Sequence, residues 1–353
     1  MAGRGVSVYV DPMRETIAAA ALPVAPADRA VGLWLLACCA LIFAMVVIGG
    51  ITRLTESGLS IVEWRPITGV LPPLGEAAWQ IEFDKYRQID QYRLMNQGMS
   101  LDEFKTIFFW EWFHRLWGRL IGVVFAVPFV WFLARGQVRG ALAAKLFLLF
   151  CLGGLQGAIG WWMVKSGLEA NMLAVSQYRL AIHLGLALLL YVGLLWTALD
   201  LLRRRATAHA GGLAVLGLAY TTAMAGAFVA GLDAGMRFNT FPLMDGQLVP
   251  AGYGDIEPFW KNLFENHASV QFNHRWLGIA CLLAVGAFAW RLREQAPRAA
   301  IAMALAVSVQ VALGIATLLL WVPVPLAAAH QAGSVVLLTA VAFAAHAAGS
   351  KQA

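Results

Sequence analysis

Eight apolar runs, each long enough to cross a bilayer, constrain this chain more than any other feature. A helix of about 20 residues spans the hydrocarbon core. Charged residues make up 13% of the chain and hydrophobic ones 60%, whereas soluble domains carry about 25% charged residues. The sequence therefore predicts an all-α polytopic membrane protein with eight transmembrane helices. The runs are residues 32–52, 107–134, 141–164, 178–200, 211–232, 268–290, 299–321 and 326–347.

The loops between these runs differ in charge from one side to the other. Loops after the second, fourth and sixth runs are short and basic, as in Arg203-Arg204-Arg205. The opposite loops are longer and acidic: residues 52–106 carry eight acidic and six basic residues, and residues 233–266 carry five and two. Because short cytoplasmic loops are rich in Lys and Arg, both termini are predicted to be cytoplasmic. This distribution accounts for the net charge of +6 without a nucleic-acid partner.

The N-terminal residues and the cysteines carry no targeting or disulfide signal. Residues 1–30 mix charges with prolines and lack an apolar core followed by a cleavage site, which predicts a disordered cytoplasmic tail. The cysteines all fall within apolar runs, so the outer loops contain none and the thiols are interpreted as packing residues. They are Cys38, Cys39, Cys151 and Cys281.

The two halves of the chain resemble each other. Because each half contains an even number of spans, four, both halves start on the same side of the membrane. This predicts a parallel repeat whose copies are related by an axis along the membrane normal. We expect two pseudo-symmetric four-helix bundles, residues 31–205 with the long outer loop 52–106, and residues 206–348. The matching pairs are Phe113-His114-Arg115 with Asn273-His274-Arg275, residues 155–160 with 309–314, and residues 47–50 with 229–231.

Local signals give a coarse picture of the connections. Residues 75–99 mix aromatic and charged side chains, which suggests interfacial helix. Ser100 and Glu103 have the spacing of a capping box that starts the second span. Gly153 and Gly157 have the spacing of a close helix contact.

Four of the seven histidines form a set. His114, His183, His274 and His330 each lie within roughly two turns of the start of an even-numbered span, at a similar depth on the outer side. A single intramembrane histidine is explained by a helix–helix hydrogen bond, but two per repeat at one depth are not. Facing imidazoles in a four-helix bundle can hold a haem from both sides. Zinc fits less well because it takes four ligands at short spacing.

The residues around these histidines differ between the halves. Glu111 lies one helical turn before His114, whereas Gln271 holds the matching place before His274. A carboxyl group beside only one haem site suggests that this site performs chemistry, the alternative being a salt bridge to Arg115. Arg115 and Arg275 are candidate partners of haem propionates, or else interfacial anchors.

These motifs resemble the haem A synthase family. The resemblance rests on Glu111-x-x-His114-Arg115, Asn273-His274-Arg275-Trp276 and residues 49–55, and it covers about residues 30 to 345. Some members carry a cysteine pair in the first outer loop, and this chain has none there. It is therefore similar to the proteobacterial and mitochondrial type, without a loop thiol.

The resemblance implies oxidation of the C8 methyl group of haem O to the formyl group of haem A, for cytochrome oxidase. It implies a haem b cofactor between His274 and His330, and substrate haem O near His114 and His183. It also implies that Glu111 is the catalytic carboxylate, acting in proton transfer or charge stabilisation.

The resemblance further implies a place and partners. The expected site is the bacterial inner membrane, with the haem sites toward the periplasmic face. Expected partners are haem O synthase, the oxidase assembly machinery, a membrane electron acceptor and the bilayer itself; a homo-oligomer stays open. The residues alone leave two other classes: a di-haem b-type electron carrier, which would not need Glu111 on one side only, and a transporter, which would place polar groups near the midplane.

Overall fold

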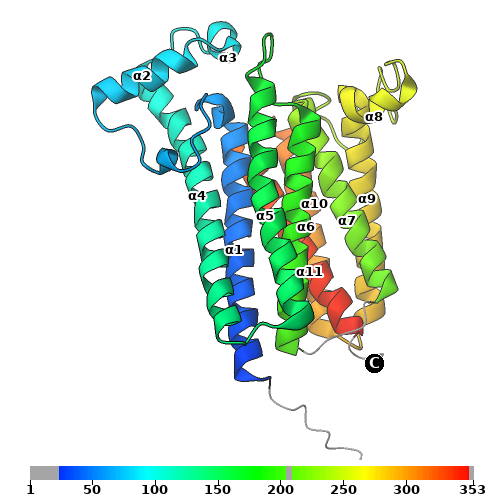
Figure 1. Cartoon of the computed structure of the whole chain (residues 1–353). Coiled ribbons are helices and arrows are strands. Elements are labelled where there is room, and N and C mark those ends of the chain that lie inside the picture. The colour runs from blue at the N-terminus through cyan, green and yellow to red at the C-terminus, as the bar shows by residue number, and fades with distance from the viewer. Residues whose placement is uncertain (1–23, 204–208, 350–353) are drawn as a thin grey trace, which may run out of the picture.

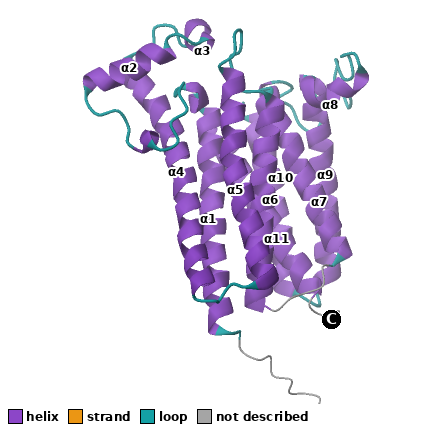
Figure 2. Cartoon of the chain, in the orientation of Figure 1, coloured by secondary structure: helices purple, strands orange, loops and turns teal. Residues whose placement is uncertain are grey.

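The computed structural model describes residues 24–203 and 209–349, and its secondary structure there is helical, with no β-strand. Eight helices have the length and apolar character of membrane spans, and they stand side by side in one bundle (Figures 1 and 2). The prediction of eight spans is confirmed. They are α1 (Pro26–Leu54), α4 (Leu101–Ala134), α5 (Gly140–Gly167), α6 (Gln177–Arg203), α7 (Ala210–Gly231), α9 (His267–Leu292), α10 (Pro297–Leu319) and α11 (Val324–Gly349).

Two spans begin earlier than expected, and their first residues explain why. Helix α1 starts at Pro26 with Asp28 in its first turn; proline suits the first helical position, and an acid favours the N-terminal end of the helix dipole. Helix α4 starts at Leu101 because Ser100 and Glu103 form the complete capping box. Most of the predicted tail, residues 1–23, lies outside the described residues.

Each half of the bundle closes as a ring of four helices in the same order. In the first half α1 contacts α4, α4 contacts α5, α5 contacts α6, and α6 returns to α1. In the second half α7, α9, α10 and α11 follow the same order. The halves meet through α6 against α7, α1 against α11, and α6 against α11. This is the packing that a parallel repeat predicts.

The packed core fills one end of the bundle. Its members include residues 31–46 of α1, 188–199 of α6, 281–292 of α9 and 335–348 of α11, all toward the end that carries the short loops (Figure 1). The other end, called here the outer end, carries the long loops and is less densely filled with buried apolar side chains.

The long loops form small caps over the outer end. The first contains the 3₁₀ turns η2 (Ser57–Leu59) and η3 (Thr68–Val70) and the helices α2 (Glu76–Tyr86) and α3 (Asp90–Leu94). An aromatic cluster seats α2 and α3 on the start of α4; its buried members are Phe83, Tyr86, Tyr92, Phe104 and Phe108. The second contains η4 (Ala234–Met236), η5 (Phe259–Lys261) and α8 (Asn262–Glu265).

The expected close contact at Gly153 and Gly157 is wrong. No side chain or backbone of another described element lies within 4 Å of a Cβ built at either glycine. Helix α5 lies at the edge of the bundle, and most of its surface is exposed. Glycine spacing alone does not specify a neighbour.

Candidate haem site

The four predicted histidines lie on the four helices that descend from the outer end. His183, His274 and His330 are the seventh, eighth and seventh residues of α6, α9 and α11, whereas His114 is the fourteenth residue of α4. The expected two-turn spacing is therefore wrong for His114, because the capping box starts α4 above the rest of the bundle. All four lie just beyond the packed core and are partly exposed.

Each of these histidines packs against a glycine on the preceding spanning helix. At Gly49, Gly160 and Gly314 a side chain would collide with the imidazole, because real Cβ atoms essentially never lie within 3.0 Å of another heavy atom; at Gly226 the contact would be unusually tight. The glycine therefore provides the space that the ring occupies. The distances from an ideal Cβ to the histidine Cε1 are 2.8 Å for Gly49 and His114, 2.9 Å for Gly160 and His183, 3.0 Å for Gly226 and His274, and 2.8 Å for Gly314 and His330.

These contacts correct one part of the predicted repeat. Gly49 and Gly226 occupy the same place in the two halves, since each faces the first histidine of its half. The sequence comparison paired residues 47–50 with 229–231, and that pairing is wrong. The match of Gly160 with Gly314 agrees with the predicted alignment of their segments. Gly49, Gly160 and Gly314 lie in the segments that the sequence comparison matches, and Gly226 does not. The sequence does not indicate the role of these glycines opposite the histidines, because that role depends on which helices pack together.

In the C-terminal half the two imidazoles face each other. The ring centres of His274 and His330 are 6.4 Å apart, and the rings are nearly perpendicular at 81°. Imidazoles binding one iron from opposite sides have ring centres about 6 Å apart, since each metal–nitrogen bond is about 2 Å long and each ring centre lies about 1 Å further. The spacing fits a haem iron.

Backbone carbonyls orient these two rings. His274 Nδ1 lies 3.1 Å from the Thr222 carbonyl oxygen, and His330 Nδ1 lies 3.2 Å from that of Gln310. When Nδ1–H donates to the carbonyl, Nε2 keeps its lone pair for a metal, which is the usual arrangement of ligating histidine. Each carbonyl is one turn before the glycine that faces the same ring.

The pair in the N-terminal half is less constrained. The Nδ1 atoms of His114 and His183 are buried without a hydrogen-bond partner in the described structure, and among its ring contacts there is none between these two imidazoles. The two halves therefore share the glycine contacts but differ in how firmly the rings are held.

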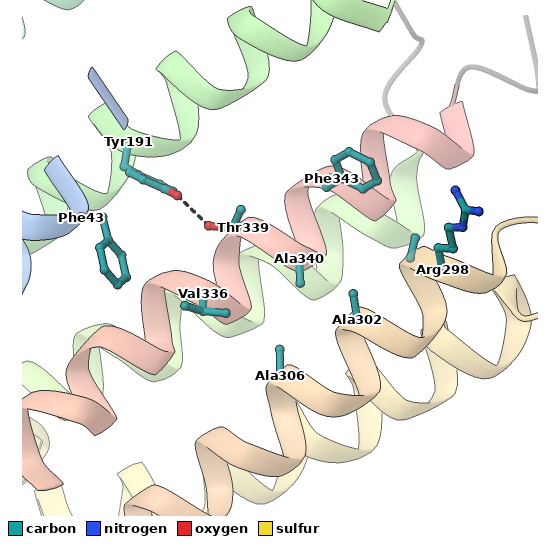
Figure 3. Close-up of a pocket in the computed structure, with 10 residues that line it drawn as sticks. Phe43, Tyr191, Arg298, Ala302, Ala306, Val336, Thr339, Ala340 and Phe343 are labelled. Carbon is teal, nitrogen blue, oxygen red and sulfur yellow. Dashed lines mark hydrogen bonds between the residues drawn. The ribbon is translucent and has the colours of Figure 1, made fainter. Parts of the chain in front are cut away.

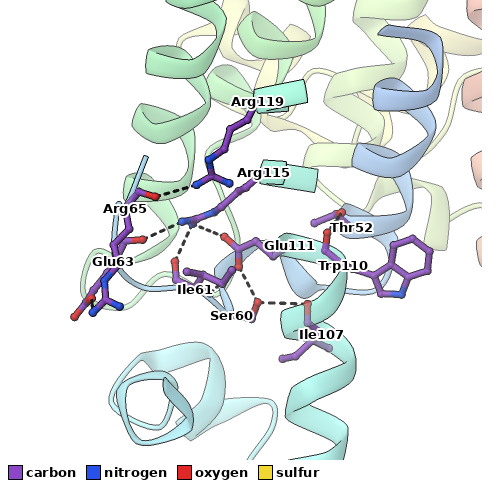
Figure 4. Close-up of polar contacts among 10 residues, drawn as sticks. All are labelled: Thr52, Ser60, Ile61, Glu63, Arg65, Ile107, Trp110, Glu111, Arg115 and Arg119. Atoms are coloured by element: carbon purple, nitrogen blue, oxygen red, sulfur yellow. Dashed lines mark hydrogen bonds and ion pairs between the residues drawn. The ribbon is translucent and has the colours of Figure 1, made fainter. Parts of the chain in front are cut away.

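Glu111 is buried, with 3% of its surface exposed, and all its partners are visible in Figure 4. Its Oε1 accepts from Arg115 at 2.5 Å, and its Oε2 accepts from Ser60 Oγ at 2.8 Å and from the backbone N–H of Ile61 at 2.7 Å. The salt bridge weighed as an alternative is therefore present. The salt bridge itself lies within α4, and the bonds from Ser60 and Ile61 to Glu111 fasten the loop after α1 to α4, one turn from His114.

Gln271 and Arg275 make the matching arrangement in the second half. Gln271 Nε2 donates to the carbonyls of Ala234 and Arg237, at 2.8 and 2.5 Å, and its Oε1 accepts from Arg275 at 3.0 Å. The two halves thus use opposite polarity at one position: the glutamate accepts from the loop, and the glutamine donates to it.

The two candidate propionate partners are engaged with loop carbonyls. Arg115 donates to Ile61 and Glu63, both at 2.9 Å. Arg275 donates to Phe238 and Thr240, at 2.5 and 2.7 Å. These contacts assign both guanidinium groups a loop-holding role, and the propionate role stays a prediction.

Other features of the described chain do not compete with the histidine pairs. Residues 24–203 and 209–349 contain no group of three or more His, Cys, Asp and Glu that could hold a metal ion. A cavity of about 480 Å³ lies between α1, α6, α10 and α11, lined by Phe43, Ala306 and Phe343 with Arg298 at one end (Figure 3). It includes no histidine.

Comparison with known proteins agrees with these features. The sequence profile of the cytochrome oxidase assembly protein family matches residues 32–342. A haem A synthase of Parvibaculum lavamentivorans is 52% identical over 315 residues, which cover 88% of this chain and 91% of the relative. A haem A synthase of Rhodospirillum centenum is 53% identical over 332 residues, which cover 89% of this chain and 87% of the relative. A haem A synthase of Azorhizobium caulinodans is 50% identical over 341 residues, which cover 92% of this chain and 96% of the relative.

Proposed function

The chain belongs to the cytochrome oxidase assembly protein family, and on that premise we propose that it is a haem A synthase, an enzyme of haem A biosynthesis. In the proposed reaction the C8 methyl group of haem O is oxidised to a formyl group. The first step gives an alcohol and the second a hydrated aldehyde, which loses water. Each step adds one oxygen atom at the oxidation level of water and releases two protons and two electrons, and the electrons pass to a membrane electron acceptor.

The single observation that carries this proposal is the facing pair His274 and His330. Their 6.4 Å separation and their carbonyl-bound Nδ1 atoms fit two residues that would together hold haem b permanently. Bound there, haem b would supply one-electron redox chemistry. The protein contributes the fixed orientation of both rings, which the glycine contacts and the carbonyls determine together.

His114 and His183 are proposed to hold the substrate haem O. A substrate must enter and leave, and rings whose Nδ1 atoms lack a partner can reorient without breaking a hydrogen bond. This difference between the halves supports assigning the cofactor to residues 206–348 and the substrate to residues 31–205.

Glu111 is proposed to be the catalytic carboxylate. It is one turn from His114, and its carboxylate oxygens accept hydrogen bonds from Arg115, Ser60 and the Ile61 N–H, which fix its position. A fixed negative charge at this place can stabilise positive charge that develops on the substrate.

We propose that the protein lies in the bacterial inner membrane, with the histidine pairs toward the periplasm. The basic loops at the opposite end of the bundle support this orientation. Haem O synthase and the oxidase assembly machinery are the proposed partners.

Expression with a supply of haem O, followed by chromatography of extracted haems, tests the function. A haem A synthase yields haem A or its alcohol intermediate. A di-haem electron carrier, the alternative class, binds haem but leaves haem O unchanged, and that outcome would overturn the proposal.

A further inference from the structure

One stretch of the first outer loop does not share the charge of its surroundings. Between Trp64 and Gly75, here called the descending segment, the only charged residue is Arg65. The rest of the loop is rich in acidic and basic residues, and many of them form ion pairs, such as that between Lys85 and Glu82. A surface segment in water has no need to exclude charge, so this composition calls for an explanation.

The descending segment lies beside α4, below the level of α2 and α3 (Figure 1). Arg119 Nε donates to the Pro66 carbonyl at 2.8 Å, and its Nη2 donates to that of Arg65 at 2.9 Å. Arg119 is 15 residues from the inner end of α4 at Ala134, which is about 22 Å along the helix. Since the hydrocarbon core is about 30 Å thick, Arg119 lies within the membrane span, and its side chain reaches back toward the outer boundary.

An aromatic contact gives the same depth independently. The rings of Trp64 and Trp161 are 6.2 Å apart, and Trp161 belongs to the outer part of α5, next to the exposed Trp162. Tryptophans gather where a membrane protein crosses the bilayer–water boundary. Trp64 therefore brings the start of the descending segment to that boundary.

The apolar side chains of the segment point away from the protein. Ile67 is 83% exposed, Leu71 70% and Leu74 75%. Leu94, in α3 above the bundle, is also 70% exposed. Exposure alone does not distinguish these leucines, but their height does: only the descending segment is beside a spanning helix.

Three backbone carbonyls of the segment, those of Arg65, Pro66 and Val70, have the partners that irregular structure needs near lipid. An unpaired carbonyl in the bilayer costs several kcal/mol. Besides the two carbonyls held by Arg119, that of Val70 accepts from Trp112 Nε1 at 3.0 Å. The donors come from α4, as Figure 4 shows for Arg119 and the Arg65 carbonyl, so the helix satisfies these three loop carbonyls from its own side.

We propose that the descending segment is immersed in the outer interfacial layer of the bilayer, with Ile67, Leu71 and Leu74 in contact with lipid. The partner is the lipid surface. This places the membrane-active part of the loop at residues 64–75, before the stretch 75–99 for which interfacial helix was expected. This proposal requires that α4 crosses the membrane, and it does not depend on which residues bind haem.

Spin labels on matched leucines test this immersion. Leu71→Cys, Leu74→Cys and Leu94→Cys would be made singly in the full chain with Cys151→Ser, since the other three cysteines are buried. Each labelled protein is reconstituted in phosphatidylcholine–phosphatidylglycerol vesicles. Collision with oxygen, which concentrates in lipid, is compared with collision with a water-soluble nickel chelate.

The expected ratio of oxygen to nickel collisions is several-fold higher at positions 71 and 74 than at 94. Equal ratios at the three positions would place the segment in water and overturn the proposal. Shielding of 71 and 74 from both reagents would also overturn it, because it would show that a second protein copy covers the segment. Extracted haems, measured on the same samples, report the proposed function separately.

Discussion

At the scale of single residues, Glu111 and Gln271 occupy equivalent places but differ in charge. Gln271 fastens its loop with a neutral amide, bonded to Arg275 and to two carbonyls. A negative charge is therefore not required to hold such a loop. The charge of Glu111 adds something that the second half does without, which supports a role in the chemistry beside His114.

Replacing Glu111 by alanine separates that role from haem binding. We expect Glu111→Ala to abolish haem A formation while haem b stays bound, because His274 and His330 belong to the other half. Gln271→Ala is the matched control: it removes the equivalent loop contact, at a cost of about 1–3 kcal/mol for unpaired buried groups, but should still yield haem A. Chromatography of extracted haems gives the yield, and a wild-type yield from Glu111→Ala would contradict the assignment.

The glycines that face the histidines give a second prediction at this scale. Gly226→Ala and Gly314→Ala add a methyl group 3.0 and 2.8 Å from an imidazole Cε1, so both should lower haem b content and change its absorption spectrum. Gly217→Ala, also on α7, meets nothing within 4 Å and should keep full haem content, with stability raised by about 0.5–1 kcal/mol. Unchanged spectra in all three variants would show that the rings do not need this space.

At the scale of elements, the sequence predicted what depends on one-dimensional signals. The apolar runs gave the eight spans, and Ser100 with Glu103 marked the start of α4. What needed the structure was the pairing of distant segments. Gly49 faces His114 across 65 positions, and Arg119 holds Pro66 across 53, and no local pattern specifies such contacts. Gly153 and Gly157 show the converse, a helix-contact spacing without a neighbour.

The attachment of α2 gives a pH-dependent prediction. Lys85 Nζ lies 3.0 Å from Glu63 and 2.9 Å from Glu82. The hydrogen bond from Lys85, aided by the charges of Lys85 and Arg65, lowers the pKa of Glu63. Because the folded pKa is below the unfolded value of about 4.3, this contact is complete above that pH and is lost as the pH falls through the folded pKa.

A nitroxide at Ile81→Cys, on the exposed side of α2 in the Cys151→Ser background, would report this change. Its mobility should rise as the pH falls below about 4. Lys85→Met should make the label mobile already at neutral pH and reduce the response to acid. An identical acid response in that variant would show that the Glu63–Lys85 contact does not attach α2.

At the scale of the whole molecule, the two rings of helices suggest a duplicated unit. Arg115 donates to the carbonyls of residues 61 and 63, and Arg275 donates to those of residues 238 and 240. In both halves the arginine therefore binds two carbonyls that are two positions apart in the loop. The halves differ in charge, with Glu111 in one and Gln271 in the other, and in the hydrogen-bond partners of the imidazole Nδ1 atoms.

Fusion reporters can test the orientation of the whole bundle. Green fluorescent protein fused after Ala353 should fluoresce, because the basic loops predict a cytoplasmic C-terminus. Alkaline phosphatase inserted in the loop 238–266 should be active, since it folds only in the periplasm. The reverse pattern would place the histidine pairs on the cytoplasmic side.

One consequence follows from the position of all four histidines at one end of the bundle, just beyond the packed core. An electron passing between haems held at the two proposed sites would travel along the membrane rather than across it. A charge gains or loses about 2.3 kcal/mol per 100 mV only when it crosses the membrane. Electron exchange between the two proposed sites would therefore perform no electrical work, and its equilibrium would be the same in an energised cell as in a de-energised vesicle.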